Sequence, residues 1–231
     1  MPEQTTNRKK IITVKQNGNV VRLDEEAITN LFHQLYYYSA EKTWQNTFWF
    51  GLPVLKNPFD MWIYQEIIYE IQPDIIIETG TYFGGSALYM ALMCDALGTG
   101  RIITIDVTEH KQRQSHPRVQ YMLGSSTSEE IVTEVKKIID GKKKVMVILD
   151  SDHSKNHVLK ELKIYSQFVS LGSYLVVEDT NINGHPVRPN WGAGPMEALE
   201  EFMQTAKDFV VDKSKEKFLF TQNPKGFLKK V

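Results

Sequence analysis

The chain has 231 residues, of which 42% are hydrophobic, and a formal net charge of −1. This length supports one sizeable core with a small appendage, and the near-neutral charge argues against a nucleic acid or an anionic membrane surface as partner. The single cysteine, Cys94, excludes an intramolecular disulfide and no apolar run is long enough to cross a bilayer, so we expect a cytoplasmic protein that acts on a small molecule or a glycan.

The N-terminal part of the chain is predicted to be an extension of the main fold. Residues 1–10 are polar and basic, and we expect them to fray. Two β-prone runs separated by an Asn-Gly dipeptide predict a hairpin over residues 11–23. Asp24 is a suitable N-cap for a helix that continues to about Ser39, because apolar residues then recur at helical spacing.

A dense group of aromatic residues follows: Tyr36, Tyr37, Tyr38, Trp44, Phe48, Trp49 and Phe50. Such groups are most often core, then intersubunit contacts, and least often part of a ligand pocket. A homo-oligomer formed through this segment is therefore one expectation. Glycine and proline then break the chain before a predicted helix over 58–71 with proline in its first turn. We divide the chain accordingly into an extension, residues 1–57, and a main domain, residues 58–231.

Residues 74–86 are predicted to form a strand, a glycine-rich turn and the start of a helix. Three consecutive isoleucines are typical of a strand buried on both faces, and such a turn lies where open α/β sheets bind their ligands. The spacing of Gly80, Gly84 and Gly85 does not fit the dinucleotide fingerprint. Glu78 would repel a pyrophosphate but would favour the positive charges of S-adenosylmethionine. The alternative is a turn that only connects a strand to a helix.

The alternation of strands and helices continues and predicts a mostly parallel sheet, with further strands at about 101–106, 119–123, 145–149 and 173–177. Asp106 ends the strand at 101–106, where an acidic residue often accepts hydrogen bonds from ribose hydroxyls; the alternative is a solvated strand end. Gly124 and Ser125 begin a turn of small residues that could lie along the adenosine. Segments 209–211 and 218–228 are expected to close the sheet as a pair of edge strands.

Four acidic residues arrive at the carboxyl ends of two later strands: Asp150, Asp152, Glu178 and Asp179. They would repel one another without a cation, and hard oxygen ligands favour Mg²⁺, Ca²⁺ or Mn²⁺. The alternative is that they cap helices or pair with basic side chains. His153 lies three residues after Asp150, and beside a metal ion its imidazole is a candidate general base.

The runs Glu78–Ser86, Leu149–His153, Val177–Thr180 and 184–198 resemble the cephalosporin hydroxylase family. That family resembles class I S-adenosylmethionine-dependent methyltransferases and includes rhamnosyl O-methyltransferases. The resemblance covers roughly residues 42–228 and implies a Rossmann-like fold with a mostly parallel, seven-stranded sheet and helices on both faces.

The resemblance also implies site residues. The methyl donor would be contacted by the Glu78–Ser86 turn, with Glu78, Gly80, Tyr82, Gly84 and Ser86, and by Asp106. Gly124 and Ser125 in the small-residue turn, and Asp150, complete the expected cofactor site. Magnesium would be held by Asp150 or Asp152, which compete for the first ligand position, together with Glu178 and Asp179. His153 and Asp150 match the catalytic positions of related metal-dependent O-methyltransferases.

The sequence thus predicts an S-adenosylmethionine-dependent, magnesium-assisted O-methyltransferase. We expect an in-line displacement in which His153 accepts the proton of a substrate hydroxyl while its oxygen attacks the methyl group. A sugar-type diol is favoured because it would chelate the metal. Two alternatives stay open: an iron-dependent hydroxylase that uses His153, His185 and a carboxylate, and a non-catalytic assembly partner that keeps the cofactor fold.

Overall fold

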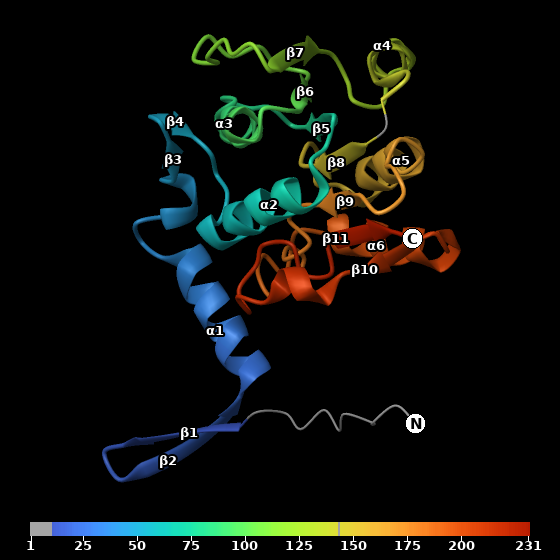
Figure 1. Cartoon of the computed structure of the whole chain (residues 1–231). Helices are drawn as coiled ribbons and strands as arrows, with labels where there is room; N and C mark the ends of the chain where they lie inside the picture. Colours follow the sequence, from blue (N-terminus) through green and yellow to red (C-terminus); the bar gives the residue numbers. More distant parts are fainter. Residues whose placement is uncertain (1–10, 143) are drawn as a thin grey trace.

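The computed structural model describes residues 11–142 and 144–231 and contains a central sheet, flanking helices and an N-terminal arm (Figure 1). The prediction for residues 1–10 lies outside the described residues. Within the described part of the chain, no helix combines the length and the apolar character that a membrane span requires.

The central sheet has seven strands in the order β10-β11-β9-β8-β5-β6-β7. The parallel strands are β5 (Ile75–Thr79), β6 (Arg101–Asp106), β7 (Val119–Leu123), β8 (Val145–Leu149) and β9 (Tyr174–Val177). At one edge, β11 (Phe227–Lys230) pairs antiparallel with β9, and β10 (Phe209–Val211) pairs antiparallel with β11. The predicted fold class is confirmed, although the last strand lies further along the chain than the expected start at 218.

Helices cover both faces of the sheet (Figure 1). One face packs against α4 (Glu129–Ile139), α5 (Lys155–Tyr165) and α6 (Pro195–Thr205), and the other against α2 (Pro58–Ile71) and α3 (Gly85–Leu97). Alternation along β5 explains why both faces are apolar: Ile75 and Ile77 belong to the first cluster, and Ile76 to the second. All five residues of β5 are buried, so the central strand is held from both sides.

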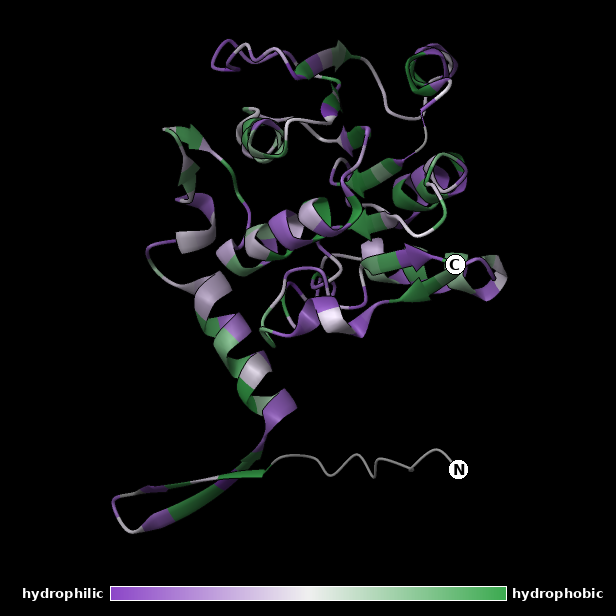
Figure 2. Ribbon diagram, viewed as in Figure 1, coloured by the Kyte–Doolittle hydropathy of each residue, from purple (hydrophilic) through white to green (hydrophobic). Residues whose placement is uncertain are grey.

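The arm consists of the hairpin β1 (Ile11–Gln16) and β2 (Asn19–Asp24), followed by α1 (Glu25–Tyr38). The side chain of Asp24 accepts a hydrogen bond from the Ala27 N–H at 2.8 Å, which confirms the predicted N-cap. Figure 1 shows the arm extending away from the sheet, and Figure 2 shows hydrophobic residues on the hairpin strands.

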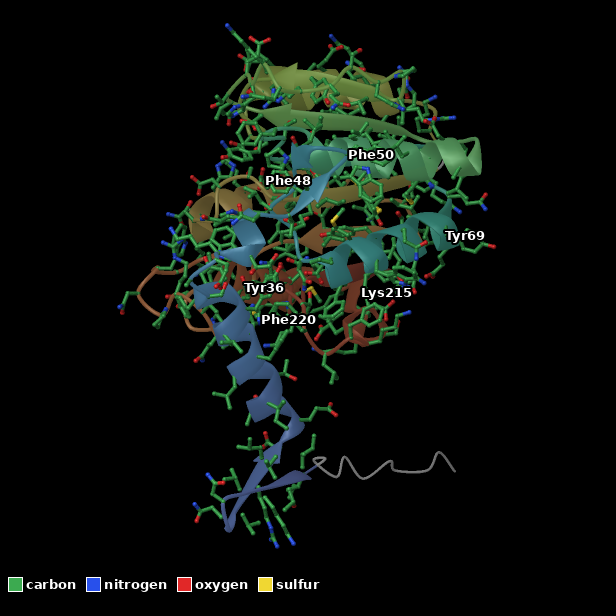
Figure 3. The ribbon with its side chains drawn as sticks, turned by 90° about the vertical axis from the view of Figure 1, so that its left-hand side faces the viewer. Tyr36, Phe48, Phe50, Tyr69, Lys215 and Phe220 are labelled. Atoms are coloured by element: carbon green, nitrogen blue, oxygen red, sulfur yellow. The ribbon has the colours of Figure 1, made fainter. Side chains whose placement is uncertain are left out.

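The aromatic segment after α1 joins the arm to the sheet. It contains the 3-10 helix η1 (Thr43–Gln45) and the short hairpin of β3 (Phe48–Trp49) and β4 (Leu52–Pro53). A second 3-10 helix, η2 (Lys213–Glu216), lies far along the chain between β10 and β11. The rings of Tyr36 and Phe220 lie 5.1 Å apart (Figure 3). Phe48 and Phe50 are 59% and 74% exposed. The segment therefore contributes both to packing and to surface, and a boundary at residue 57 remains a prediction.

Candidate active site

A cavity of about 560 Å³ lies at the carboxyl ends of the parallel strands. Residues at or after the ends of β5, β6, β7, β8 and β9 line it: Gly80, Asp106, Gly124, Asp150 and Glu178. The N-terminal segment adds Tyr37 and Trp44, and the loop after β9 adds Arg188 and Trp191. Its volume is typical of a pocket for a small molecule.

Gly80 places the end of β5 directly against the end of β8. Its φ is +87°, and a Cβ atom at this position would lie 1.8 Å from the backbone oxygen of Asp150. The Gly80 N–H donates to the oxygen of Ile105 at 2.8 Å, so the same residue also contacts β6. The glycine at this turn therefore permits three strand ends to meet beside the cavity.

Most of the residues predicted to contact a cofactor line this cavity: Gly80, Tyr82, Ser86, Asp106, Gly124, Ser125 and Asp150. Glu78 and Gly84 are not among the lining residues. Glu78 is fully buried, and its Oε2 accepts a hydrogen bond from Thr104 Oγ1 at 2.7 Å. Burial raises the pKa of Glu78 to about 7. Its carboxyl group therefore joins β5 to β6 behind the cavity wall.

Asp106 is held firmly at the end of β6. Its Oδ2 accepts from the Tyr82 N–H at 2.7 Å and lies 3.2 Å from Arg113 Nη2, and its Oδ1 accepts from the Thr108 N–H at 2.9 Å. Arg113 also donates to the Tyr82 oxygen at 2.9 Å. These contacts within the protein fix the orientation of the Asp106 carboxylate at the edge of the cavity.

Three side chains form a compact group at the β8 and β9 ends. One ligand atom each from Asp150, His153 and Asp179 lies within 4.8 Å of the other two, and His153 Nε2 is 3.2 Å from Asp179 Oδ2. Burial raises the pKa of both carboxyls. Burial alone would lower the pKa of His153, but the charges of Asp179 and Asp150 outweigh it and raise that pKa. The protonation of each of these three groups therefore depends on the charge of the other two.

Lys56 had no predicted role in the site, yet its ammonium lies among these acids. Its Nζ donates to Asp150 Oδ2 at 2.7 Å and to Glu178 Oε1 at 2.5 Å, and the side chain is only 4% exposed. Glu178 Oε1 also accepts from Tyr64 OH at 2.7 Å. Burial opposes a charge on Lys56, but the carboxylates of Asp150 and Glu178 outweigh it and raise the lysine pKa.

Asp152 stands apart from this group. It is exposed, and its Oδ1 accepts from the Ser154 N–H at 2.7 Å, at the start of α5. His185 is also elsewhere, since its Nε2 lies 2.9 Å from Glu197 Oε1 and it does not line the cavity. The structure therefore does not assemble the two-histidine iron site that the hydroxylase alternative needs.

The loop after β9 covers one side of the group. Trp191 Nε1 donates to the backbone oxygen of His153 at 3.2 Å, and the Arg188 guanidinium lies 4.2 Å from the centre of the Trp191 ring. The Arg188 N–H donates to Tyr38 OH at 2.6 Å, which links this loop to the arm. The indole ring of Trp191 therefore stands close to His153.

Comparison with known proteins gives a consistent family. The model for "Rhamnosyl O-methyltransferase/CmcI" matches residues 41–231. A protein named rhamnosyl O-methyltransferase from Mycobacterium tuberculosis (strain ATCC 25618 / H37Rv) is 40% identical over 211 residues, which cover 88% of this chain and 85% of that protein. The protein of the same name from Mycobacterium leprae (strain TN) is 38% identical over 210 residues, covering 88% and 90%.

Solved structures share the fold. An apo structure of CmcI aligns with a TM-score of 0.61 and 19% identity, covering 81% of this chain and 77% of that one. A structure of CmcI described as Mg-SAM aligns with a TM-score of 0.59 and 18% identity over the same shares. At these identities the likeness concerns the fold alone.

Proposed function

The chain belongs to the rhamnosyl O-methyltransferase/CmcI family and is therefore an S-adenosylmethionine-dependent O-methyltransferase, and we propose that it methylates a sugar-type hydroxyl with the help of Mg²⁺. The observation that carries the proposal is the group of Asp150, His153 and Asp179 beside the Gly80 turn. The name of the relatives supports a sugar as the substrate class.

The acidic side chains suit a hard divalent ion. Mg²⁺ is commonly bound through one or two carboxylates and keeps its remaining positions for water and substrate oxygens. Lys56 donates to one oxygen of Asp150 and, together with Tyr64, to one oxygen of Glu178. Asp150 and Asp179, unlike Glu178, also belong to the compact group with His153. We propose that Asp150 and Asp179 hold the ion, which would act as a Lewis acid toward the substrate oxygen.

His153 is proposed as the general base. An imidazole is a less suitable ligand for Mg²⁺ than an oxygen, so the neutral ring of His153 would be left to accept the proton of a substrate hydroxyl. The hydrogen bond between its backbone oxygen and Trp191 holds the residue near the cavity wall. The charge that it gains would be stabilised by Asp179, 3.2 Å away.

The methyl donor is proposed to lie along the ends of β5 and β6. Asp106 has its carboxylate oriented to accept hydrogen bonds from the ribose, and Gly80 lines the cavity at the turn after β5. The aromatic side chains of Tyr37, Trp44 and Trp191 line the same cavity and offer apolar surface to a sugar ring. This arrangement supports an attack by the hydroxyl in line with the departing thioether.

A direct assay tests this function. Purified protein is incubated with S-adenosylmethionine and a simple alkyl rhamnoside, with added Mg²⁺ or with a chelator, and the products are separated by mass spectrometry. We expect S-adenosylhomocysteine and a mono-methylated glycoside only when Mg²⁺ is present. Methyl transfer that proceeds equally with chelator would contradict the role of the metal. No transfer to any sugar diol would contradict the sugar substrate.

His153→Ala gives the matching test of the base. General-base catalysis contributes about 10²–10⁴-fold, so kcat should fall by that factor, while calorimetry should show unchanged affinity for S-adenosylhomocysteine. His185→Ala is the matched control, because His185 lies outside the cavity beside Glu197. If His153→Ala retained wild-type kcat, another group would have to accept the proton.

A further inference from the structure

A second polar cluster, with other members than the acids proposed to hold the metal, lies in the cavity wall. Glu161 is fully buried on α5, a position where a charged residue is unusual. Its Oε1 accepts from Ser126 Oγ at 2.5 Å and from Ser151 Oγ at 2.8 Å. Both serines and His157 line the cavity. We call Ser126, Ser151, His157 and Glu161 the serine–glutamate cluster.

The protons in this cluster can be assigned from its donors and acceptors. A serine hydroxyl has one proton, and in both serines that proton points to Glu161. His157 Nε2 is 3.2 Å from Ser126 Oγ, so the imidazole must be the donor in that contact. The hydrogen bond to Glu161 raises the pKa of His157, which agrees with a protonated ring nitrogen. The serine oxygens therefore face the cavity as acceptors only.

The cluster is fixed by the surrounding fold. Tyr165 OH donates to the backbone oxygen of Ser126 at 2.7 Å, which holds the turn after β7 against α5. Glu161 Oε2 is buried and has no hydrogen-bond partner among the described residues. Such an atom costs free energy, so packing alone gives no reason for an acid here. The need to orient the two serine hydroxyls would explain why an acid stands here.

The position of the cluster relates it to the methyl donor. Ser126 follows Gly124, whose N–H donates to the Asp106 oxygen at 2.8 Å, and Ser151 follows Asp150, which contacts Gly80. The cluster thus adjoins both the strand end proposed for the ribose and the turn proposed for the methionine part. The remaining part of the donor is its purine base.

We propose that Glu161 determines specificity for the purine of the methyl donor, by orienting Ser126 and Ser151 as acceptors for the exocyclic amine of adenine. This inference rests on the proposed function, because it assumes that S-adenosylmethionine occupies the cavity. A purine with an oxygen at the same position would place an acceptor against two acceptors and would be rejected.

The test compares S-adenosylhomocysteine with S-inosylhomocysteine, which carries a carbonyl in place of the amine, by isothermal titration calorimetry. We expect the wild-type protein to bind the inosyl compound roughly 10- to 100-fold more weakly. In Glu161→Gln the amide nitrogen can donate to a serine oxygen and release that serine's proton toward the cavity. The preference for adenine should then fall to a few-fold.

Ser151→Ala removes one acceptor while leaving the carboxylate in place, so it should reduce the same preference even if Glu161→Gln folds poorly. Glu134→Gln on the exposed face of α4 is the matched control and should keep the wild-type preference. Equal wild-type affinity for the two compounds, or an unchanged preference in the Ser151 variant, would overturn the inference. Failure of the wild type to bind either compound would instead overturn the proposed function.

Discussion

The arm and the central sheet both follow their local sequence patterns, but apolar residues are buried in the sheet and largely exposed in the arm. Every residue of β5 is buried. In the arm, Ile11, Val20 and Leu35 are 63%, 55% and 70% exposed, although Figure 2 shows hydrophobic residues in both regions. Periodicity therefore predicts the element, whereas burial depends on a partner from elsewhere in the chain.

The junction between these regions is well packed. His33 is 3% exposed, with its Nε2 2.8 Å from Asn181 Nδ2 and its ring 4.7 Å from that of Phe220. Beyond this point α1 continues away from the sheet (Figures 1 and 3). We therefore expect substitutions in the sheet to affect the whole fold and the site, and those in the arm to have local effects.

The largest effect is expected at Gly80. In Gly80→Ala the new Cβ would lie 1.8 Å from the backbone oxygen of Asp150, just after β8, so the strand ends must separate. The loss of unfolding free energy should exceed about 4 kcal/mol. Chemical denaturation measures it. Gly98→Ala is the control, because φ there is also positive, at +73°, but no atom lies within 4 Å; only about 1–2 kcal/mol should be lost. Similar losses in both variants would contradict the proposed clash.

The next largest effect is expected at Lys56. Lys56→Met would leave Asp150 and Glu178 without their buried counter-ion. Breaking a buried pair from one side costs about 3–5 kcal/mol, which urea unfolding followed by circular dichroism would show. Lys155→Met removes the more exposed pair with Glu201 and should cost at most about 1 kcal/mol. Glu178→Gln added to Lys56→Met should restore part of the loss, and no recovery would argue against this electrostatic cause.

The attachment of the arm should weaken in acid through His33. Burial lowers its pKa to about 4 from an ordinary 6.5. The unfolded state then binds a proton first, so stability is complete above pH 6.5 and is lost as pH falls toward 4. The stability lost in total is about 3 kcal/mol, because each unit of pKa difference corresponds to about 1.4 kcal/mol.

Hydrogen exchange of the α1 amides, corrected for intrinsic rates, would measure this change. We expect α1 to lose protection between pH 6.5 and 4 before β5 does. His33→Phe removes the titrating group and should flatten the pH dependence of α1. Equal loss of protection in α1 and β5 would contradict a local detachment of the arm. It would indicate that acid destabilises the whole fold.

The same contrast explains what the sequence could predict. The strands, the Asp24 cap and the acids at strand ends are local or period-based signals, and they were predicted correctly as structure. Lys56 was missed because its contacts to Asp150 and Glu178 span 94 and 122 residues. An isolated lysine after an apolar run carries no local sign of such partners. Asp152 satisfied the same acidic pattern, but its carboxylate accepts a hydrogen bond from the Ser154 N–H just before the next helix.

The smallest effect on folding is expected at exposed apolar residues of the N-terminal segment, where the predicted homo-oligomer can be tested. Phe50 is 74% exposed (Figure 3), so Phe50→Ser should change the unfolding free energy of one chain by less than about 0.5 kcal/mol. If copies associate through this aromatic segment, the mass measured by light scattering should fall. Leu171→Ser, at a residue 75% exposed but outside the segment, is the control and should keep the wild-type mass. An equal mass for all three proteins would mean that Phe50 is not part of such a contact.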